Sequence, residues 1–206
     1  LLENNSVRVP EIFAFSEDLR FMLQEDLGDV TLDTHKGLDN RIVLEQALNQ
    51  LSLIYSVDQD VLKAFTYDDL FKQTSNFLDI FKDRNVSLSK NEISSIHNLR
   101  KKLVELIMNQ PFLPTHNDFE RRNFIYYKEQ IYIIDFQDIN VGPMGMDLAS
   151  LLYEHDFDYP ENLINELLQK HCKRNGLGLD AKDADILIKQ VLTHRSMRCV
   201  ALLNDF

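Results

Sequence analysis

The feature that most constrains the fold is a change in the spacing of apolar residues along the chain. From about Gly37 to Ile107, apolar side chains recur every three or four residues, as they do on one face of a helix. Between Pro111 and Pro143 they follow a period of two, and after Pro143 the helical spacing returns. This order predicts an α+β fold in which a small amount of sheet is set in a mostly helical body.

Three helices are predicted before Pro111. The core face of the first is formed by Ile42, Val43, Ala47, Leu48, Leu51, Ile54 and Tyr55. The second covers 70–81. The third begins at Ser89, which stands three residues before Glu92 in a capping-box spacing, and its inward residues are Ile93, Ile96, Leu99, Leu103, Leu106 and Ile107. After Pro143, helices are predicted at about 146–154, at 160–174 and from Asp180 to the end.

Two β-hairpins are predicted from short apolar runs separated by polar residues. The first pairs 12–15 with 21–23 across a turn that starts at 16–18. The second pairs 123–127 with 131–136 across the tight turn 128–130. The segment 27–37 is the predicted hinge between the first hairpin and the helical body.

Charge and composition exclude several classes of function. The 206 residues carry a formal net charge of −11, which repels a phosphate backbone, so nucleic acid is not an expected partner. The apolar runs fall short of the roughly 20 residues that span a membrane, and the N-terminus lacks the pattern of a secretory signal. Cys172 and Cys199 are too few for a disulfide framework. The chain is therefore expected to be soluble and cytoplasmic, with free thiols.

Three polar side chains are brought together by the second hairpin. Asp118 lies in the loop His116–Asn123, and Asp135 follows the apolar run 131–134, twelve residues after Asn123. Since Asn123 begins one strand and Asp135 ends the next, an antiparallel pairing places both at the same end, close to Asp118. Two carboxylates and one amide suit phosphoryl transfer. One carboxylate orients a substrate hydroxyl, and the other carboxylate and the amide oxygen hold Mg²⁺ against nucleotide phosphates.

These motifs resemble a known family. HNDFERRN followed by IIDFQD is similar to the catalytic and metal-binding loops of the aminoglycoside phosphotransferase and choline kinase family, which shares the protein-kinase-like fold. The resemblance extends to Gly142–Pro143, to DLASLL at 147–152 and to 24–28. The run IDFQD, GP and DLASLL is most similar to those bacterial members that phosphorylate the anomeric hydroxyl of N-acetylmuramate and N-acetylglucosamine during cell-wall recycling.

The resemblance implies a role for each of nine residues, with ATP as the phosphoryl donor. Asp118 would be catalytic, and Asn123 and Asp135 would bind Mg²⁺. His116 would shape the loop, and Asp147 would be a buried acid that accepts hydrogen bonds from it. Gln24, Glu25 and Leu27 would lie in the linker that meets the adenine. Asp138 has two interpretations, a contact to the acceptor sugar or a strand-end residue in solvent.

The resemblance also implies a division of the chain at residue 30. Residues 1–30 would be the last strands of the N-terminal lobe and the inter-lobe linker, and 31–206 would be the helical C-terminal lobe. The glycine-rich loop and the lysine of such kinases are not found ahead of Gln24. The chain is therefore expected to be a fragment that binds ATP weakly and transfers phosphate slowly when alone.

Alternative functions remain open at the level of sequence. The acceptor could be an aminoglycoside, choline, homoserine or another small alcohol, and a non-catalytic pseudokinase or interaction module is an alternative of a different class. Zinc chemistry has little support, because no two of the six histidines are three or four residues apart. A serine hydrolase is disfavoured by the lack of G-x-S-x-G.

Overall fold

The computed structural model describes residues 1–35, 37–153 and 157–202. The helices within these ranges are α1 (Asn40–Ile54), α2 (Tyr67–Gln73), α3 (Asp79–Asp83), α4 (Lys90–Met108), α5 (Gly145–Leu152), α6 (Glu161–Arg174) and α7 (Ala181–Leu202). The strands are β1 (Ile12–Ser16), β2 (Phe21–Gln24), β3 (Phe112–Thr115), β4 (Phe124–Tyr127), β5 (Gln130–Ile133) and β6 (Asn140–Pro143). They pair in antiparallel fashion as β1–β2, β3–β6 and β4–β5.

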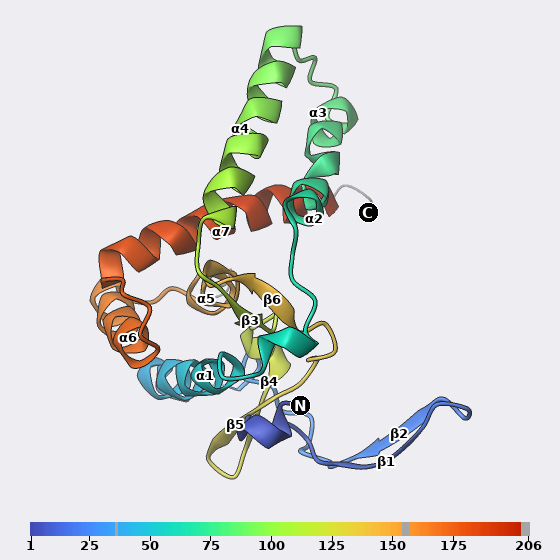
Figure 1. The fold of residues 1–206 in the computed structure, drawn as a ribbon, viewed down its shortest axis with the longest axis vertical. Helices are drawn as coiled ribbons and strands as arrows, with labels where there is room; N and C mark the ends of the chain where they lie inside the picture. The colour runs from blue at the N-terminus through green and yellow to red at the C-terminus, as the bar shows by residue number, and fades with distance from the viewer. Residues whose placement is uncertain (36, 154–156, 203–206) are drawn as a thin grey trace.

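The helical body is built around α5. Every residue of α5 is buried, and α1, α6 and α7 surround it together with the short strands (Figure 1). Gly145 permits the close packing of α5 against α7, because a Cβ atom at this position would lie 3.1 Å from the Leu187 carbonyl oxygen. Leu51, which the helical spacing predicts as core in α1, is fully buried, and so is Leu148 of α5.

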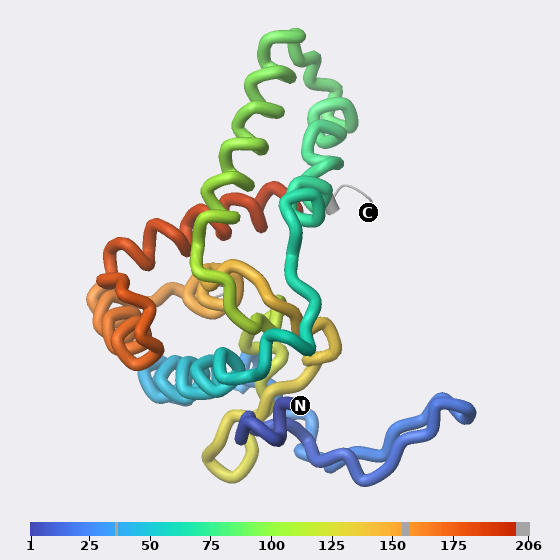
Figure 2. The backbone as a smooth tube through the Cα atoms, viewed as in Figure 1, coloured from blue at the N-terminus to red at the C-terminus, as the bar shows by residue number. Residues whose placement is uncertain are grey.

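Two parts of the chain project from this body. The segment from α3 to α4 forms an arm, and the β1–β2 hairpin extends away from the helices at another side of the molecule (Figure 2). The side chains of this hairpin are exposed, including Phe15 at 70%. The hairpin predicted at 12–15 and 21–23 is confirmed, with the turn at 17–20.

The prediction of a single helix over 70–81 is wrong. The chain forms α2, a 3-10 turn at Ser75–Leu78 and then α3. The break occurs at Thr74, whose hydroxyl donates to the Phe71 carbonyl oxygen at 3.2 Å and accepts from Nε of the buried Arg100 at 2.9 Å. Because the Thr74 side chain bonds to the backbone of the preceding turn and to Arg100 of α4, it ends the helix that the apolar spacing would continue.

Several residues predicted to face the core are exposed. Ile42 is 50% exposed in α1, and Ile93, Leu99 and Leu106 are 37%, 56% and 41% exposed in α4. In α4, burial is confined to Arg100, Leu103, Val104 and Ile107. The first half of α4 lies in the projecting arm, where few elements are available to cover its apolar residues (Figure 1).

The second hairpin is confirmed, with corrections at both ends. Asn123 lies in a 3-10 turn (Arg121–Asn123), and β4 begins at Phe124. β5 ends at Ile133, so Asp135 follows the strand by two residues. The strands β3 and β6 were not predicted, since each has four residues and contains a proline. They pair from Phe112–Pro143 to Thr115–Asn140, which brings the loop after Thr115 close to the segment before Asn140.

The segment after β2 is anchored on the second hairpin. Leu27 and Leu32 are buried, the Leu32 N–H donates to the Phe124 carbonyl oxygen at 2.9 Å, and Thr31 bridges to Ile125. The division at residue 30 stays a prediction. The predicted ends of two helices are Glu154, for the helix at 146–154, and Phe206, for the last helix. Both of these ends lie outside the described residues.

None of the helices in the described part of the chain combines the length and the apolar character needed to cross a membrane.

Candidate active site

The loop that carries Asp118 is held in place by Asp147 from α5. Both carboxylate oxygens of Asp147 accept backbone hydrogen bonds, from His116 N–H at 2.7 Å and from Asn117 N–H at 2.8 Å. Asp147 is fully buried. This burial raises the pKa of its carboxyl to about 7, although the two N–H donors act in the opposite direction. A buried acid at this position therefore fixes the backbone of the loop two residues before Asp118.

Asn123 closes the same loop from its other end. Its side-chain Nδ2 donates to the Asp118 carbonyl oxygen at 2.8 Å, and its own carbonyl oxygen accepts from Ile134 N–H at 3.0 Å. Since the amide nitrogen is used within the loop, the remaining polar atom of the side chain is the amide oxygen. Asn123 thus joins the Asp118 loop to the residue that precedes Asp135.

His116 connects the Asp118 loop to the segment that follows β5. Its Nε2 lies 3.0 Å from the Ile134 carbonyl oxygen, which can only accept, so Nε2 carries the proton. Burial lowers the pKa of the imidazole, while the carboxylates of Asp118 and Asp135 both raise it by their negative charge. Both acids are therefore close enough to act electrostatically on this one ring. Phe119 packs against it edge-on, with the ring centroids 5.8 Å apart.

The backbone at Asp135 and Asn117 is unusual. Asp135 has φ 61° and Asn117 has φ 77°, in the left-handed region that few side chains adopt. The Asn117 side chain donates to the Asp138 carbonyl oxygen, and Gln137 Nε2 donates to Asp135 Oδ1. Left-handed residues outside glycine cost free energy and occur often at functional sites. The loops after β3 and β5 are thus joined to each other and shaped together.

The carboxylate of Asp118 lies between two arginines. Arg122 Nη2 is 3.9 Å from Oδ2, and Arg195 Nη2, from α7, is 3.9 Å from Oδ1. Both arginines also contact Glu120, Arg122 at 3.0 Å through Nε and Arg195 through Nη2. The side chain of Asp118 is 42% exposed, so it is accessible to a substrate hydroxyl while its charge is partly balanced.

The donor set is compatible with Mg²⁺. This ion prefers oxygen ligands and is commonly bound by one or two carboxylates together with substrate phosphates. Asp135 is exposed and supplies a carboxylate, and Asn123 supplies an amide oxygen whose nitrogen is already engaged. Among the described residues, no group of three or more His, Cys, Asp and Glu side chains is arranged to hold a metal ion. The predicted pair would therefore rely on phosphate oxygens for further ligands.

The predicted adenine-contact residues lie at the end of β2 and in the segment that follows it. Gln24 ends β2 and is exposed, Glu25 is partly buried, and Leu27 is buried. Glu25 N–H pairs with the Glu11 carbonyl oxygen at 2.8 Å, which continues the β1–β2 ladder. Asp138 is exposed, and its carbonyl oxygen rather than its carboxylate contacts Asn117. The roles of these residues stay predictions.

Sequence reasoning missed the residues around Asp118. Asn117, Glu120 and Arg122 stand within the recognised motif, but their contacts cannot be inferred from their spacing. Arg195 is 77 residues after Asp118 by sequence number and carries no motif. The only sequence signal that could have identified it is an arginine on the inward face of the last predicted helix.

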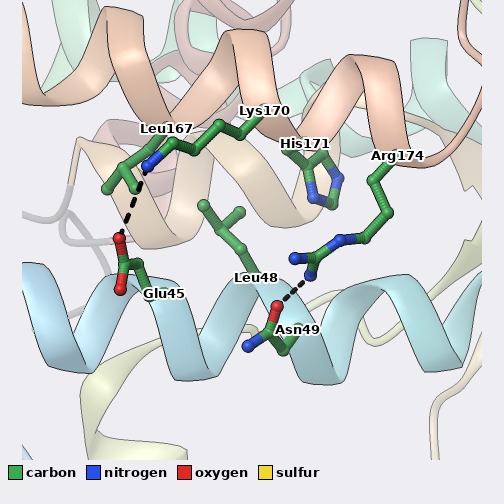
Figure 3. Close-up of a pocket in the computed structure, with 7 residues that line it drawn as sticks. All are labelled: Glu45, Leu48, Asn49, Leu167, Lys170, His171 and Arg174. Atoms are coloured by element: carbon green, nitrogen blue, oxygen red, sulfur yellow. Dashed lines mark hydrogen bonds and ion pairs between the residues drawn. The ribbon is translucent and has the colours of Figure 1, made fainter.

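Two hollows in the surface differ in their relation to the loop. One, of about 230 Å³, includes the two arginines that contact Asp118 and is lined by Asp33, Glu120, Arg122, Ala149, Ser150, Tyr153, Leu192, Arg195, Ser196 and Cys199. The other, of about 350 Å³, lies between α1 and α6 (Figure 3). In it, Lys170 reaches Glu45 at 3.8 Å and Arg174 reaches Asn49, so these polar contacts join the two helices. None of the predicted site residues lines either hollow.

A helical body with a catalytic-loop hairpin at its edge is the architecture of the protein-kinase-like phosphotransferases. The model of the phosphotransferase enzyme family matches residues 1–181 of the chain. The chain belongs to this family.

Two curated relatives share the family. The N-acetylmuramate/N-acetylglucosamine kinase of Neisseria meningitidis serogroup B is 24% identical over 187 residues, which cover 86% of this chain and 56% of the relative. The protein of the same name from Pseudomonas aeruginosa is 29% identical over 179 residues, which cover 84% of this chain and 53% of the relative. The chain thus spans about half the length of the curated relatives that it matches.

Solved structures share the fold. The ADP-bound aminoglycoside phosphotransferase APH(2'')-Ib superposes with a TM-score of 0.65 at 18% identity, covering 97% of this chain and 71% of that one. An ethanolamine kinase of Plasmodium vivax superposes with a TM-score of 0.63 at 14% identity, covering 96% and 62%. The predicted α+β, protein-kinase-like fold is therefore confirmed.

Proposed function

We propose that the full-length protein containing this chain is an ATP-dependent, Mg²⁺-requiring kinase that phosphorylates the anomeric hydroxyl of N-acetylmuramate and N-acetylglucosamine. The observation that carries the proposal is the joining of the Asp118 loop to the end of β5. His116 and Asn123 join the loop to Ile134 through hydrogen bonds of 3.0 Å each, and Asp147 holds the loop itself at 2.7 Å. This arrangement supports the proposal that Asp118, Asn123 and Asp135 act at one shared site.

In the proposed reaction, Asp118 orients the acceptor hydroxyl and receives its proton. The acceptor oxygen forms a bond to the γ-phosphorus of ATP as the bond from that phosphorus to the β–γ bridging oxygen breaks, which releases ADP. A carboxylate is a weak base, so the main effect of Asp118 is orientation of the hydroxyl. Mg²⁺, held by Asn123 and Asp135, would supply positive charge at the phosphate oxygens.

The acceptor is proposed from the curated relatives. Both are named for these two amino sugars, and both match over more than four fifths of this chain. Gln24, Glu25 and Leu27 are proposed to meet the adenine, and Asp138 is a candidate acceptor contact. A cytoplasmic location and a place in cell-wall recycling are parts of the same proposal.

The test is an acceptor panel with purified full-length protein, ATP and Mg²⁺. The panel contains N-acetylmuramate, N-acetylglucosamine, an aminoglycoside, choline and homoserine. We expect ADP release with the two amino sugars, and a product that carries phosphate on the anomeric carbon by NMR. A higher kcat/KM for any of the other three acceptors would replace the proposed substrate. Absence of turnover with all five, together with nucleotide binding, would favour the pseudokinase alternative.

A further inference from the structure

We propose that Arg122 and Arg195 form the part of the acceptor pocket that binds a carboxylate, and that they favour an acidic sugar over a neutral one. The inference rests on the proposed function, because it concerns the two sugars that the relatives are named for. N-acetylmuramate carries a carboxylate on a lactyl ether, and N-acetylglucosamine has no such group. A pair of arginines beside the reacting hydroxyl is a means of telling them apart.

The position of the two guanidinium groups supports this assignment. They lie 3.9 Å from the two different carboxylate oxygens of Asp118, so they flank the group that is proposed to receive the hydroxyl proton. Both line the hollow of about 230 Å³, and Asp118 contacts both arginines without itself lining it. This volume is below the roughly 300–1,000 Å³ typical of pockets for drug-sized ligands, so the hollow fits a part of the acceptor, such as its carboxylate arm.

The hydrogen-bonding capacity of the arginines exceeds what their protein partners use. Each guanidinium has five N–H donors. Glu120 offers one oxygen to each arginine, and Ser150 Oγ accepts from Arg195 Nη1. Donors therefore remain for a ligand, and a planar guanidinium suits a carboxylate in a two-point contact. Arg122 is 57% exposed in its side chain, whereas Arg195 is 19% exposed and fixed between α5 and the loop.

Two acids line the same pocket and restrict where an anion can bind. Glu120 is engaged by both arginines, and Asp33 accepts from the Thr31 hydroxyl within its own loop. A bound carboxylate would be repelled at the Asp33 side and attracted at the arginine side.

The experiment measures kcat/KM for both sugars with the full-length protein and three variants. Arg122→Gln and Arg195→Gln remove one charge each, and Arg84→Gln is the matched control, since Arg84 is exposed at the end of α3. We expect each of the first two to lower the ratio of kcat/KM for N-acetylmuramate to that for N-acetylglucosamine by about tenfold, the effect of roughly 1.4 kcal/mol. Arg84→Gln should leave the ratio unchanged.

Two further measurements separate recognition of the sugar from support of the loop. The methyl ester of N-acetylmuramate should lose the advantage of the acid with the wild-type protein and should be insensitive to Arg122→Gln. Arg195→Lys should retain part of the preference. An unchanged ratio in both glutamine variants, even with lower overall rates, would overturn the role of the arginines alone. No turnover of either sugar by the wild-type protein would overturn the proposed function and this inference with it.

Discussion

Replacement of Asp147 by asparagine tests how the Asp118 loop is held. Asp147 is fully buried and accepts the N–H groups of His116 and Asn117. Asparagine has nearly the same size but stays neutral at every pH. The variant Asp147→Asn therefore removes the buried charge and one of the two acceptors without opening a large cavity.

The magnitude follows from the shift in pKa. Burial raises the pKa of Asp147 from 3.8 to about 7. Each unit corresponds to about 1.4 kcal/mol, so ionisation of this group in the folded protein costs about 4 kcal/mol in all. The folded protein does not bear this cost below pH 3.8, where the carboxyl is protonated in both the folded and the unfolded state. Between pH 3.8 and about 7 the free energy of unfolding falls as pH rises, because the unfolded chain releases the Asp147 proton at a lower pH than the folded protein does.

The assay is urea unfolding of the full-length wild-type and Asp147→Asn proteins between pH 5 and pH 8. Every other titrating group is shared, so the difference between the two free energies of unfolding isolates Asp147. We expect the stability of the wild type to fall by about 3 kcal/mol relative to the variant over this range. Asp183→Asn, which removes an exposed carboxylate of α7, serves as the control.

A constant difference between the two proteins from pH 5 to pH 8 would refute the reasoning, since it would mean that Asp147 does not change its charge in this range. The same variant should also lower kcat by about 10²-fold at pH 8, because a displacement of a catalytic group by about 1 Å has this effect. Unchanged kcat would show that the loop does not depend on this carboxylate.

Three other substitutions test the site and the core. Asp118→Asn should lower kcat by roughly 10²- to 10⁴-fold with an unchanged melting temperature, and a smaller loss would argue against the assigned role. Asp135→Asn keeps a residue that tolerates the left-handed backbone at φ 61°, and we expect it to abolish Mg²⁺-dependent turnover in a metal titration. If saturating Mg²⁺ supports normal rates, Asp135 is not a ligand. Leu51→Ala should destabilise the protein by about 2–5 kcal/mol in urea unfolding, because Leu51 is fully buried in α1; a loss below 1 kcal/mol would contradict its place in the core.

Much of the fold could be predicted because its signals are local. The capping box of Ser89 and Glu92 is present at the start of α4, with the hydrogen bonds running in both directions. The turn of the second hairpin lies where the change of period placed it, between Tyr127 and Gln130. Hydrogen bonds between neighbours in sequence and the period of side chains depend on a few adjacent residues, so they can be read without knowledge of the tertiary structure.

Predictions failed where a distant partner decides the outcome. Arg100 reaches Thr74 across 26 positions and contributes to the end of α2. The exposure of Ile93 and Leu99 depends on whether another element covers the arm. The spacing of apolar residues within one helix shows neither where a distant side chain ends the helix nor which of its faces another element covers.

The candidate site divides in the same way. The sequence by itself predicted the class of chemistry, because Asp118, Asn123 and Asp135 belong to two short motifs joined by one hairpin. Only the tertiary structure decided what surrounds the Asp118 carboxylate. Arg195 reaches it because α7 packs on α5, and Asp147 fixes the loop because α5 is buried at the centre of the body. Spacing along the chain specifies contacts between near neighbours, whereas contacts between distant residues depend on how the helices pack.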